Sequence, residues 1–152
     1  MKHGYVTVAA AIPRVKVADT EYNAGEIFAM ISDAEDKGVE IIVFPELCIT
    51  GYTCQDLFRS DVLLSKSEEA LISLLSSTRK MDIISIVGMP VAVDGMLLNC
   101  AVVLHKGCII GIVPKTYLPN YSEFYEKRWF ASAQDLSDER QLYIAGSPAV
   151  VS

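Results

Sequence analysis

Residues 44–58 have the sequence Phe44-Pro-Glu-Leu-Cys-Ile-Thr-Gly-Tyr-Thr-Cys-Gln-Asp-Leu-Phe58. They follow an apolar run, residues 39–44, that predicts a buried strand. Glu46 therefore lies where a strand gives way to a loop, and in α/β proteins such loops collect ligands and catalytic groups. Pro45 fixes the backbone just before the acid. The position suits a functional role for Glu46, and a solvated loop acid or a helix cap stays open as the alternative.

The elements around this stretch predict a sheet that begins with parallel strands. Residues 5–12 are apolar and end at a proline, as expected of a first strand. Residues 20–37 carry apolar side chains on one face of a helix that Gly38 ends, and the residues on that face are Ile27, Met30, Ile31 and Ala34. With the strand at 39–44, this β-α-β order implies two parallel strands joined by a right-handed crossover.

A second helix and a third strand are expected next. Ser65-Lys-Ser-Glu68 has the pattern of a capping box, which predicts the start of the helix. Residues 82–89 form an apolar run that we expect to be a strand ended by Pro90.

Two hairpins then change the direction of the sheet. Asp94-Gly95 and Lys106-Gly107 are dipeptides typical of tight turns between antiparallel strands. A two-residue turn at the second place puts His105 opposite Cys108 and Cys100 opposite Val113, which argues against a disulfide between the two cysteines. The sheet is therefore predicted to be mixed.

Composition excludes several classes of function. The 152 residues suit one domain, and a net charge of −6 leaves no basic patch for nucleic acid. No run of ~18 apolar residues predicts a membrane span. Four cysteines without a C-x-x-C pair, and two histidines, make a metal site unexpected and fit a reducing, cytoplasmic setting. The hydrophobic content of 51% indicates a buried partner surface or a domain that lacks part of its own core.

Glu46 and Lys115 share a setting, because each follows a buried strand and a proline. Two strands that end side by side would bring the carboxylate and the ammonium group together. The carboxylate could then accept a proton from a nucleophile, while the ammonium group stabilises a developing oxyanion.

With these motifs the chain resembles the nitrilase, or carbon–nitrogen hydrolase, superfamily, whose catalytic set is Glu, Lys and Cys. The acid motif matches at Phe44-Pro-Glu46 and the lysine motif at Gly111-Ile-Val-Pro-Lys115. Two longer stretches, residues 44–58 and 115–130, look like the glutaminase domain of bacterial glutamine-dependent NAD synthetases. The resemblance covers essentially all 152 residues. It implies the α/β fold class, as a nitrilase-like α-β-β-α sandwich with a mixed sheet.

The resemblance also implies roles for individual residues. Glu46 would be the general base and Lys115 the lysine that stabilises the oxyanion. Glu126 matches the accessory glutamate that holds the lysine or the substrate amide, and Glu123 is the competing choice in the same loop. Tyr121 and Phe124 match positions that line a glutamine pocket, or else only pack the loop.

The implied reaction is the hydrolysis of glutamine to glutamate and ammonia through a cysteine thioester. Ammonia would pass to a synthetase domain of the same longer chain, which uses ATP and Mg to amidate nicotinic acid adenine dinucleotide. The glutaminase part itself would need no cofactor or metal. Members of the superfamily pair through their helices, so a homo-oligomer is expected, with no nucleic-acid or membrane partner.

One feature departs from the superfamily's pattern. Its nucleophilic cysteine lies on a later strand, a few tens of residues beyond the lysine, and none of the four cysteines here matches that motif. Cys48 is close to Glu46, but a buried apolar cysteine is usually inert. No Gly-rich phosphate loop is present either. We therefore expect residues 1–152 to be the N-terminal part of a glutaminase domain, truncated before the nucleophile strand, without the synthetase domain and inactive alone.

Two alternatives stay open at this point. The first is a stand-alone amidase of the same superfamily. The second is a non-catalytic interaction domain that kept the fold, although the presence of both Glu46 and Lys115 speaks against it.

Overall fold

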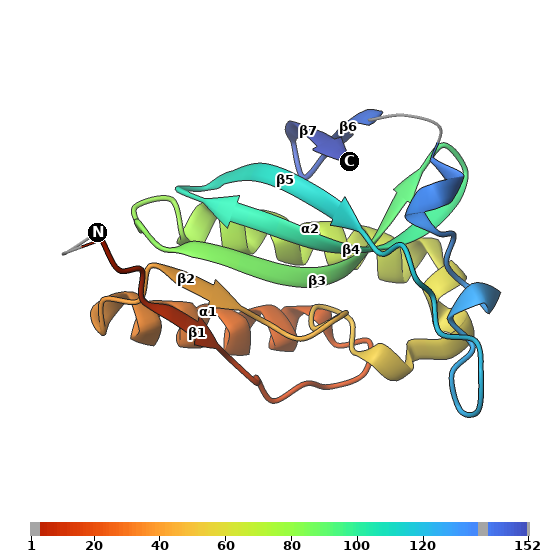
Figure 1. Ribbon diagram of the computed structural model, residues 1–152, viewed down its shortest axis with the longest axis horizontal. Coiled ribbons are helices and arrows are strands. Elements are labelled where there is room, and N and C mark those ends of the chain that lie inside the picture. Colours follow the sequence, from red (N-terminus) through yellow and green to blue (C-terminus); the bar gives the residue numbers. More distant parts are fainter. Residues whose placement is uncertain (1–3, 137–139, 152) are drawn as a thin grey trace.

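The computed structural model describes residues 4–136 and 140–151. In this part of the chain the strands form one mixed sheet in the order β1-β2-β3-β4-β5-β7-β6, and two long helices lie together behind it (Figure 1). The strands are β1 Val8–Ala10, β2 Ile41–Val43, β3 Ile84–Val93, β4 Met96–His105, β5 Cys108–Pro114, β6 Arg140–Ile144 and β7 Ser147–Val151. The helices are α1 Thr20–Asp36 and α2 Asp61–Ser77, with short 3-10 helices η1 Tyr52–Arg59, η2 Glu126–Arg128 and η3 Ala133–Asp135. The predicted α/β class and mixed sheet are confirmed.

The parallel half of the sheet follows the sequence pattern. Strands β1, β2 and β3 are parallel, and α1 connects the first two. The Asp19 side chain caps the helix by accepting a hydrogen bond from the Tyr22 N–H. Gly38, with a φ of 74°, ends the helix as predicted. Strand β1 is shorter than the predicted 5–12, because only the three residues of β2 pair with it.

The predicted start of the second helix is wrong. α2 begins at Asp61, with Ser60 in extended conformation before it, so Ser65 and Glu68 lie inside the helix and form no capping box. Asp61 puts a negative charge in the first turn, where the helix dipole favours it.

The predicted end of the third strand at Pro90 is also wrong. β3 continues to Val93 and pairs with β4 along its whole length, with Pro90 opposite Asn99. β2 pairs with β3 only as far as Ile86. A proline is tolerated beyond that point because one edge of the strand has no ladder of hydrogen bonds to interrupt.

The hairpins are confirmed, with one change of register. Asp94 and Gly95 both have positive φ, 49° and 79°, as a type I′ turn requires. At the second hairpin His105 does oppose Cys108, but Cys100 opposes Pro114 rather than Val113. An irregularity next to Val103 shifts the register by one residue. All four cysteines are free.

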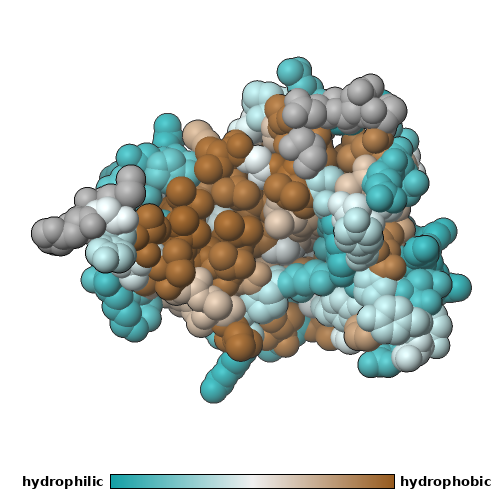
Figure 2. All heavy atoms as spheres, in the orientation of Figure 1, coloured by the Kyte–Doolittle hydropathy of each residue, from teal (hydrophilic) through white to brown (hydrophobic). Residues whose placement is uncertain are grey.

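The two faces of the sheet have different surroundings. One face packs on α1 and α2, and its core includes Ile27, Ile31, Leu71, Leu74, Val87, Val102, Leu104 and Ile112. On the other face, apolar side chains of β1 to β5 lie open, and Figure 2 shows them as one brown surface. We call this the open face; by strand alternation it consists of Val8, Ala10, Ile41, Val43, Ile84, Ile86, Ala101, Val103 and Val113.

Candidate active site

Glu46 and Lys115 meet, although their strands do not lie side by side. The Lys115 Nζ atom is 2.8 Å from Glu46 Oε1. Glu46 follows β2 and Lys115 follows β5, and strands β3 and β4 separate the two. The expectation of neighbouring strands is therefore wrong, while the predicted encounter of acid and amine is confirmed by the geometry.

The backbone after β2 crosses closely over Gly88 of β3, and this crossing brings Glu46 to Lys115. After β2 the chain follows β3, with the Ile49 N–H donating to the Gly88 carbonyl at 3.1 Å. A Cβ atom on Gly88 would lie 2.8 Å from the Pro45 carbonyl oxygen and 2.9 Å from the Glu46 carbonyl carbon. Only glycine leaves room for this crossing. The loop thereby carries Glu46 across β3 towards β4 and β5.

Asn99 connects the acid to the lysine. It is a polar residue within the apolar strand β4, and only 3% of its surface is exposed. Its side-chain amide donates to Glu46 Oε1, and its backbone carbonyl accepts the Lys115 N–H at 2.8 Å. Sequence reasoning missed Asn99, although a single amide in an apolar strand was a usable signal.

Glu126, and not Glu123, contacts the lysine. Glu126 Oε1 lies 2.9 Å from Lys115 Nζ, and the side chain is 2% exposed. The Tyr52 hydroxyl, 2.7 Å away, donates to the same oxygen. Glu126 Oε2 is buried and has no hydrogen-bond partner among the described residues. The lysine thus lies between two carboxylates, and Tyr52 is a further residue that the sequence analysis did not identify.

The electrostatics keep this site in a defined protonation state. Burial by itself lowers the pKa of Lys115, but the hydrogen bonds and charges of Glu46 and Glu126 outweigh it and raise that pKa. Burial and the neighbouring Glu126 carboxylate raise the pKa of Tyr52 well above its usual range. Lys115 is therefore a cation at neutral pH, and Tyr52 a neutral hydrogen-bond donor.

The two predicted pocket residues lie next to this cluster. The Phe124 ring contacts Tyr121 at a centroid distance of 5.7 Å and Tyr52 at 6.4 Å, both edge to face. Tyr121 is 67% exposed. The three rings form a row that starts in solvent and ends at the hydroxyl bonded to Glu126.

None of the buried cysteines has the character of a nucleophile. Cys48 Sγ accepts the Gly88 N–H at 3.3 Å, and burial raises its pKa to about 11. Burial also raises the pKa of Cys54, and raises that of Cys100 to about 12. Cys108 is exposed and lies opposite His105, at the end of β5 away from Lys115. The buried thiols stay protonated at neutral pH.

A second set of contacts ties η1 to the loop that holds Glu126. Arg128 binds Asp56 with two hydrogen bonds of 2.8 and 2.9 Å, and Trp129 Nε1 donates to the same carboxylate at 2.9 Å. Arg59 adds a bond to the Arg128 carbonyl. We call these four residues the η1–η2 clamp.

A pocket of about 380 Å³ joins the acid–amine pair to the open face. Glu46, Asn99 and Lys115 line it together with apolar open-face residues such as Val43 and Val113. Its size is within the range of small-molecule sites. No group of three or more His, Cys, Asp or Glu side chains in the described residues could hold a metal ion.

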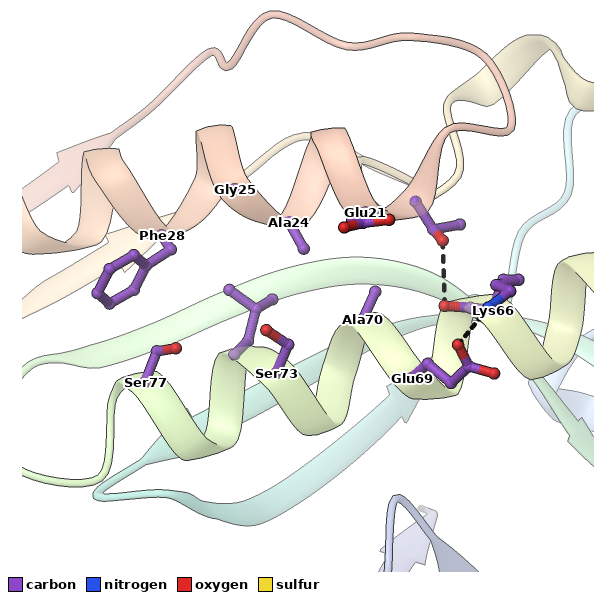
Figure 3. Close-up of a pocket in the computed structure, with 11 residues that line it drawn as sticks. Glu21, Ala24, Gly25, Phe28, Lys66, Glu69, Ala70, Ser73 and Ser77 are labelled. Carbon is purple, nitrogen blue, oxygen red and sulfur yellow. Dashed lines mark hydrogen bonds and ion pairs between the residues drawn. The ribbon is translucent and has the colours of Figure 1, made fainter.

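A larger pocket lies elsewhere and contains none of these groups. It measures about 570 Å³ and separates α1 from α2, where Ala24, Gly25 and Ala70 leave space between the helices (Figure 3). Lys66 and Glu69 form an exposed ion pair at its edge. Neither α1 nor α2, nor any other helix in the described part of the chain, is long and apolar enough to cross a membrane.

Comparison with known proteins agrees with this geometry. The family model of the carbon–nitrogen hydrolases matches residues 7–148. The chain belongs to the carbon–nitrogen hydrolase family. This assignment confirms the nitrilase-like resemblance stated from the sequence, and the expected fold is confirmed as well. An amidase from Nesterenkonia, 14% identical, has the same fold with a TM-score of 0.71 over 96% of this chain and 56% of that one.

Within this carbon–nitrogen hydrolase family, the chain is similar to glutamine-dependent NAD(+) synthetases. The protein from Mycobacterium tuberculosis is 38% identical over 130 residues, which are 86% of this chain and 19% of the relative. The one from Aquifex aeolicus is 37% identical over 78% of this chain and 21% of its own length. The structure of the Cytophaga hutchinsonii enzyme, 29% identical, superposes with a TM-score of 0.87 over 96% of this chain and 25% of that one. The chain thus spans about a fifth of the length of the curated relatives it matches.

Proposed function

We propose that this chain supplies the acid, lysine and accessory glutamate of a glutamine-hydrolysing site, as the N-terminal part of a glutamine-dependent NAD synthetase. The observation that carries the proposal is the Glu46–Lys115–Glu126 cluster, in which one ammonium group lies 2.8 and 2.9 Å from two carboxylates. Its similarity to glutamine-dependent NAD(+) synthetases supports glutamine as the substrate.

In the proposed reaction Glu46 acts as general base and Lys115 as the oxyanion-stabilising group. A thiol gives its proton to Glu46, and the thiolate attacks the side-chain carbonyl carbon of glutamine. Lys115 stabilises the negative oxygen of the tetrahedral intermediate. When this intermediate collapses, the carbon–nitrogen bond breaks, the proton on Glu46 passes to the leaving ammonia, and a thioester remains. Water then attacks the thioester and gives its proton to Glu46, the carbon–sulfur bond breaks to release glutamate, and Glu46 returns the proton to the leaving sulfur.

Glu126 and the aromatic row would bind the substrate. Glu126 Oε2 is a buried acceptor without a partner in the described residues, so an N–H of the substrate amide would satisfy it. Tyr121 and Phe124 would cover the aliphatic part of glutamine, while Tyr52 keeps Glu126 in place.

We propose that the nucleophilic cysteine comes from a segment outside these 152 residues. Cys48, Cys54 and Cys100 are buried, with raised pKa values, and Cys108 lies far from Lys115 along β5. The exposed apolar side chains of the open face support this proposal. A further sheet that covered them would also close the pocket at Glu46. A synthetase domain using ATP and Mg, a cytoplasmic setting and self-association through the helices belong to the same proposal.

The test uses the complete protein encoded by the gene, and glutamate, ammonia and NAD are measured as products. Replacing Glu46 by Gln should lower glutaminase kcat by about 10²- to 10⁴-fold, the range for a general base. NAD formation from added ammonium chloride should stay near the wild-type rate, because only the glutamine site is changed. The 152-residue chain alone should release no ammonia and should not react with a glutamine-like electrophile.

Other results would change the assignment. Labelling of Cys48 or Cys54 by the electrophile would contradict the external nucleophile. A complete protein that hydrolyses simple amides but makes no NAD would be a stand-alone amidase. A complete protein with neither activity would indicate an interaction domain.

A further inference from the structure

Asn99 lies at the centre of the site, outside the sequence motifs that identified Glu46 and Lys115. Strand alternation places it on the open face together with Ala101 and Val103. It is nevertheless only 3% exposed. Its side chain and its backbone bind the acid and the lysine respectively, so one residue sets the spacing of both groups.

The two donors that reach Glu46 bind the same oxygen. The Asn99 amide and the Lys115 ammonium group both donate to Oε1, the latter at 2.8 Å. Among the described residues, no donor reaches Glu46 Oε2. Because a carboxylate oxygen that accepts hydrogen bonds is less basic, the proton of an incoming nucleophile goes to the other oxygen.

Lys115 alone cannot hold this arrangement during turnover. Its ammonium group must also stabilise the oxyanion of the substrate, and its side chain is long and flexible. The Glu46 side chain is 40% exposed and would be free to rotate when the lysine shifts. Asn99 is short, buried and part of a paired strand, so its amide stays in place.

We propose that Asn99 is a positioning residue that anchors Glu46 Oε1 and so presents Oε2 as the proton acceptor for the nucleophilic thiol. In that step the sulfur–hydrogen bond breaks, an oxygen–hydrogen bond forms at Oε2, and the electron pair stays on sulfur as the thiolate. The inference rests on the proposed glutaminase function and adds the residue that selects the reacting oxygen.

The test compares Asn99→Leu and Asn99→Ser with the wild type in the complete protein. Leucine has a similar size and no donor, and serine is too short to reach Glu46. Both variants should lower kcat for glutamine hydrolysis by about tenfold or more and change KM by less than about threefold.

Val102→Ala is the matched control on the same strand. Val102 is fully buried and points to the helices, so this variant lowers Tm without touching Glu46. Its kcat and KM for glutamine should stay near the wild-type values. If the Asn99 variants keep the wild-type kcat, or lose no more kcat than Val102→Ala does, the proposal is wrong.

A second measurement separates this proposal from the proposed function. Carbon NMR of protein labelled at glutamate Cδ reports the surroundings of the Glu46 carboxylate at pH 7, with Glu46→Gln used to assign its signal. The chemical shift of this signal should change in Asn99→Leu and stay at the wild-type position in Val102→Ala, whether or not glutamine is hydrolysed. An identical chemical shift in Asn99→Leu and the wild type overturns the role of Asn99, whereas a wild type that does not hydrolyse glutamine overturns the proposed function.

Discussion

At the scale of single residues, the site is a balance of charges around Lys115. Two carboxylates face one ammonium group, and neutral donors from Asn99 and Tyr52 bind the same oxygens, Oε1 of Glu46 and Oε1 of Glu126, that the ammonium group binds. Of the two carboxylates, Glu126 needs these donors most, because its side chain is almost fully buried. A buried carboxylate is stable only when it is paired and hydrogen-bonded, so the neutral donors are part of the site and not accessories to it.

Replacing Tyr52 by Phe should reduce glutaminase kcat of the complete protein by about tenfold, since a hydrogen bond to a charged group contributes about 1.5–3 kcal/mol. KM should change little, because the aromatic ring still contacts Phe124. Steady-state kinetics measures both values. Tyr117→Phe, at a tyrosine that is 83% exposed, is the control and should match the wild type. Equal kcat values for Tyr52→Phe and the wild type would show that Glu126 does not need the hydroxyl.

At the scale of elements, the site depends on two segments far apart in sequence being held together. η1 follows Glu46 and carries Tyr52, while η2 contains Glu126. The η1–η2 clamp joins them through the charged pair of Asp56 and Arg128. Gln55, between Tyr52 and Asp56 in sequence, has a φ of 52° and a ψ of −130°, a strained backbone that the neighbouring contacts must maintain.

The η1–η2 clamp predicts a pH-dependent stability. The hydrogen bonds from Arg128 hold the pKa of Asp56 well below its usual range. A lowered pKa in the folded state contributes stability above the unfolded value of about 3.9, and this stability is lost as the pH falls below it. Asp56→Asn should therefore lower Tm at pH 7, and its difference from the wild type should shrink from about pH 4 downwards. Thermal unfolding by circular dichroism between pH 3 and 7 measures this.

The control for the clamp is Asp33→Asn. Asp33 pairs with Lys37 on the surface of α1 through a single exposed contact, which is expected to matter little at any pH. If the Tm difference of Asp56→Asn stayed constant from pH 7 to pH 3, charge would not be the source of the clamp's stability.

At the scale of the whole molecule, the open face separates this chain from a closed domain. Apolar side chains of five strands lie on one surface, with Val8 at 67% and Val43 at 41% exposure. An apolar surface of this size indicates an interaction site. Glu46 and Lys115 line a pocket that opens on this surface, so the protein layer that we propose would cover the surface and enclose the pocket together.

Replacing Val8 and Val43 together by Ser should reduce the fluorescence of an anilinonaphthalene sulfonate dye bound to the 152-residue chain, because the dye binds exposed apolar surface. In the complete protein the same change should lower Tm if the proposed layer covers the open face, because apolar burial is then lost. Val62→Ser with Ile72→Ser on α2 is the matched control, with exposures of 70% and 47%, and should change neither value much. Unchanged dye binding in the first variant would contradict an accessible open face.

The sequence by itself determined the α/β class, the parallel strands at the start of the sheet and the two hairpin turns, and its motifs singled out Glu46, Lys115 and, through the family resemblance, Glu126. These depend on local periodicity, on turn residues such as Asp94-Gly95, and on motifs that are each only a few residues long. The hydrophobic content of 51% also predicted more apolar surface than a closed core needs, and Figure 2 shows apolar surface on the open face.

Only the tertiary structure decided how the acid reaches the lysine across two intervening strands. That path depends on the absence of a side chain at Gly88, on the Asn99 amide and on the Tyr52 hydroxyl. The amide and the hydroxyl bind carboxylates that are 53 and 74 residues away in sequence, so only folding brings them together. The start of α2 and the continuation of β3 through Pro90 were likewise set by neighbouring elements. Local patterns specify which groups a chain offers, whereas packing between distant segments specifies which of their atoms meet.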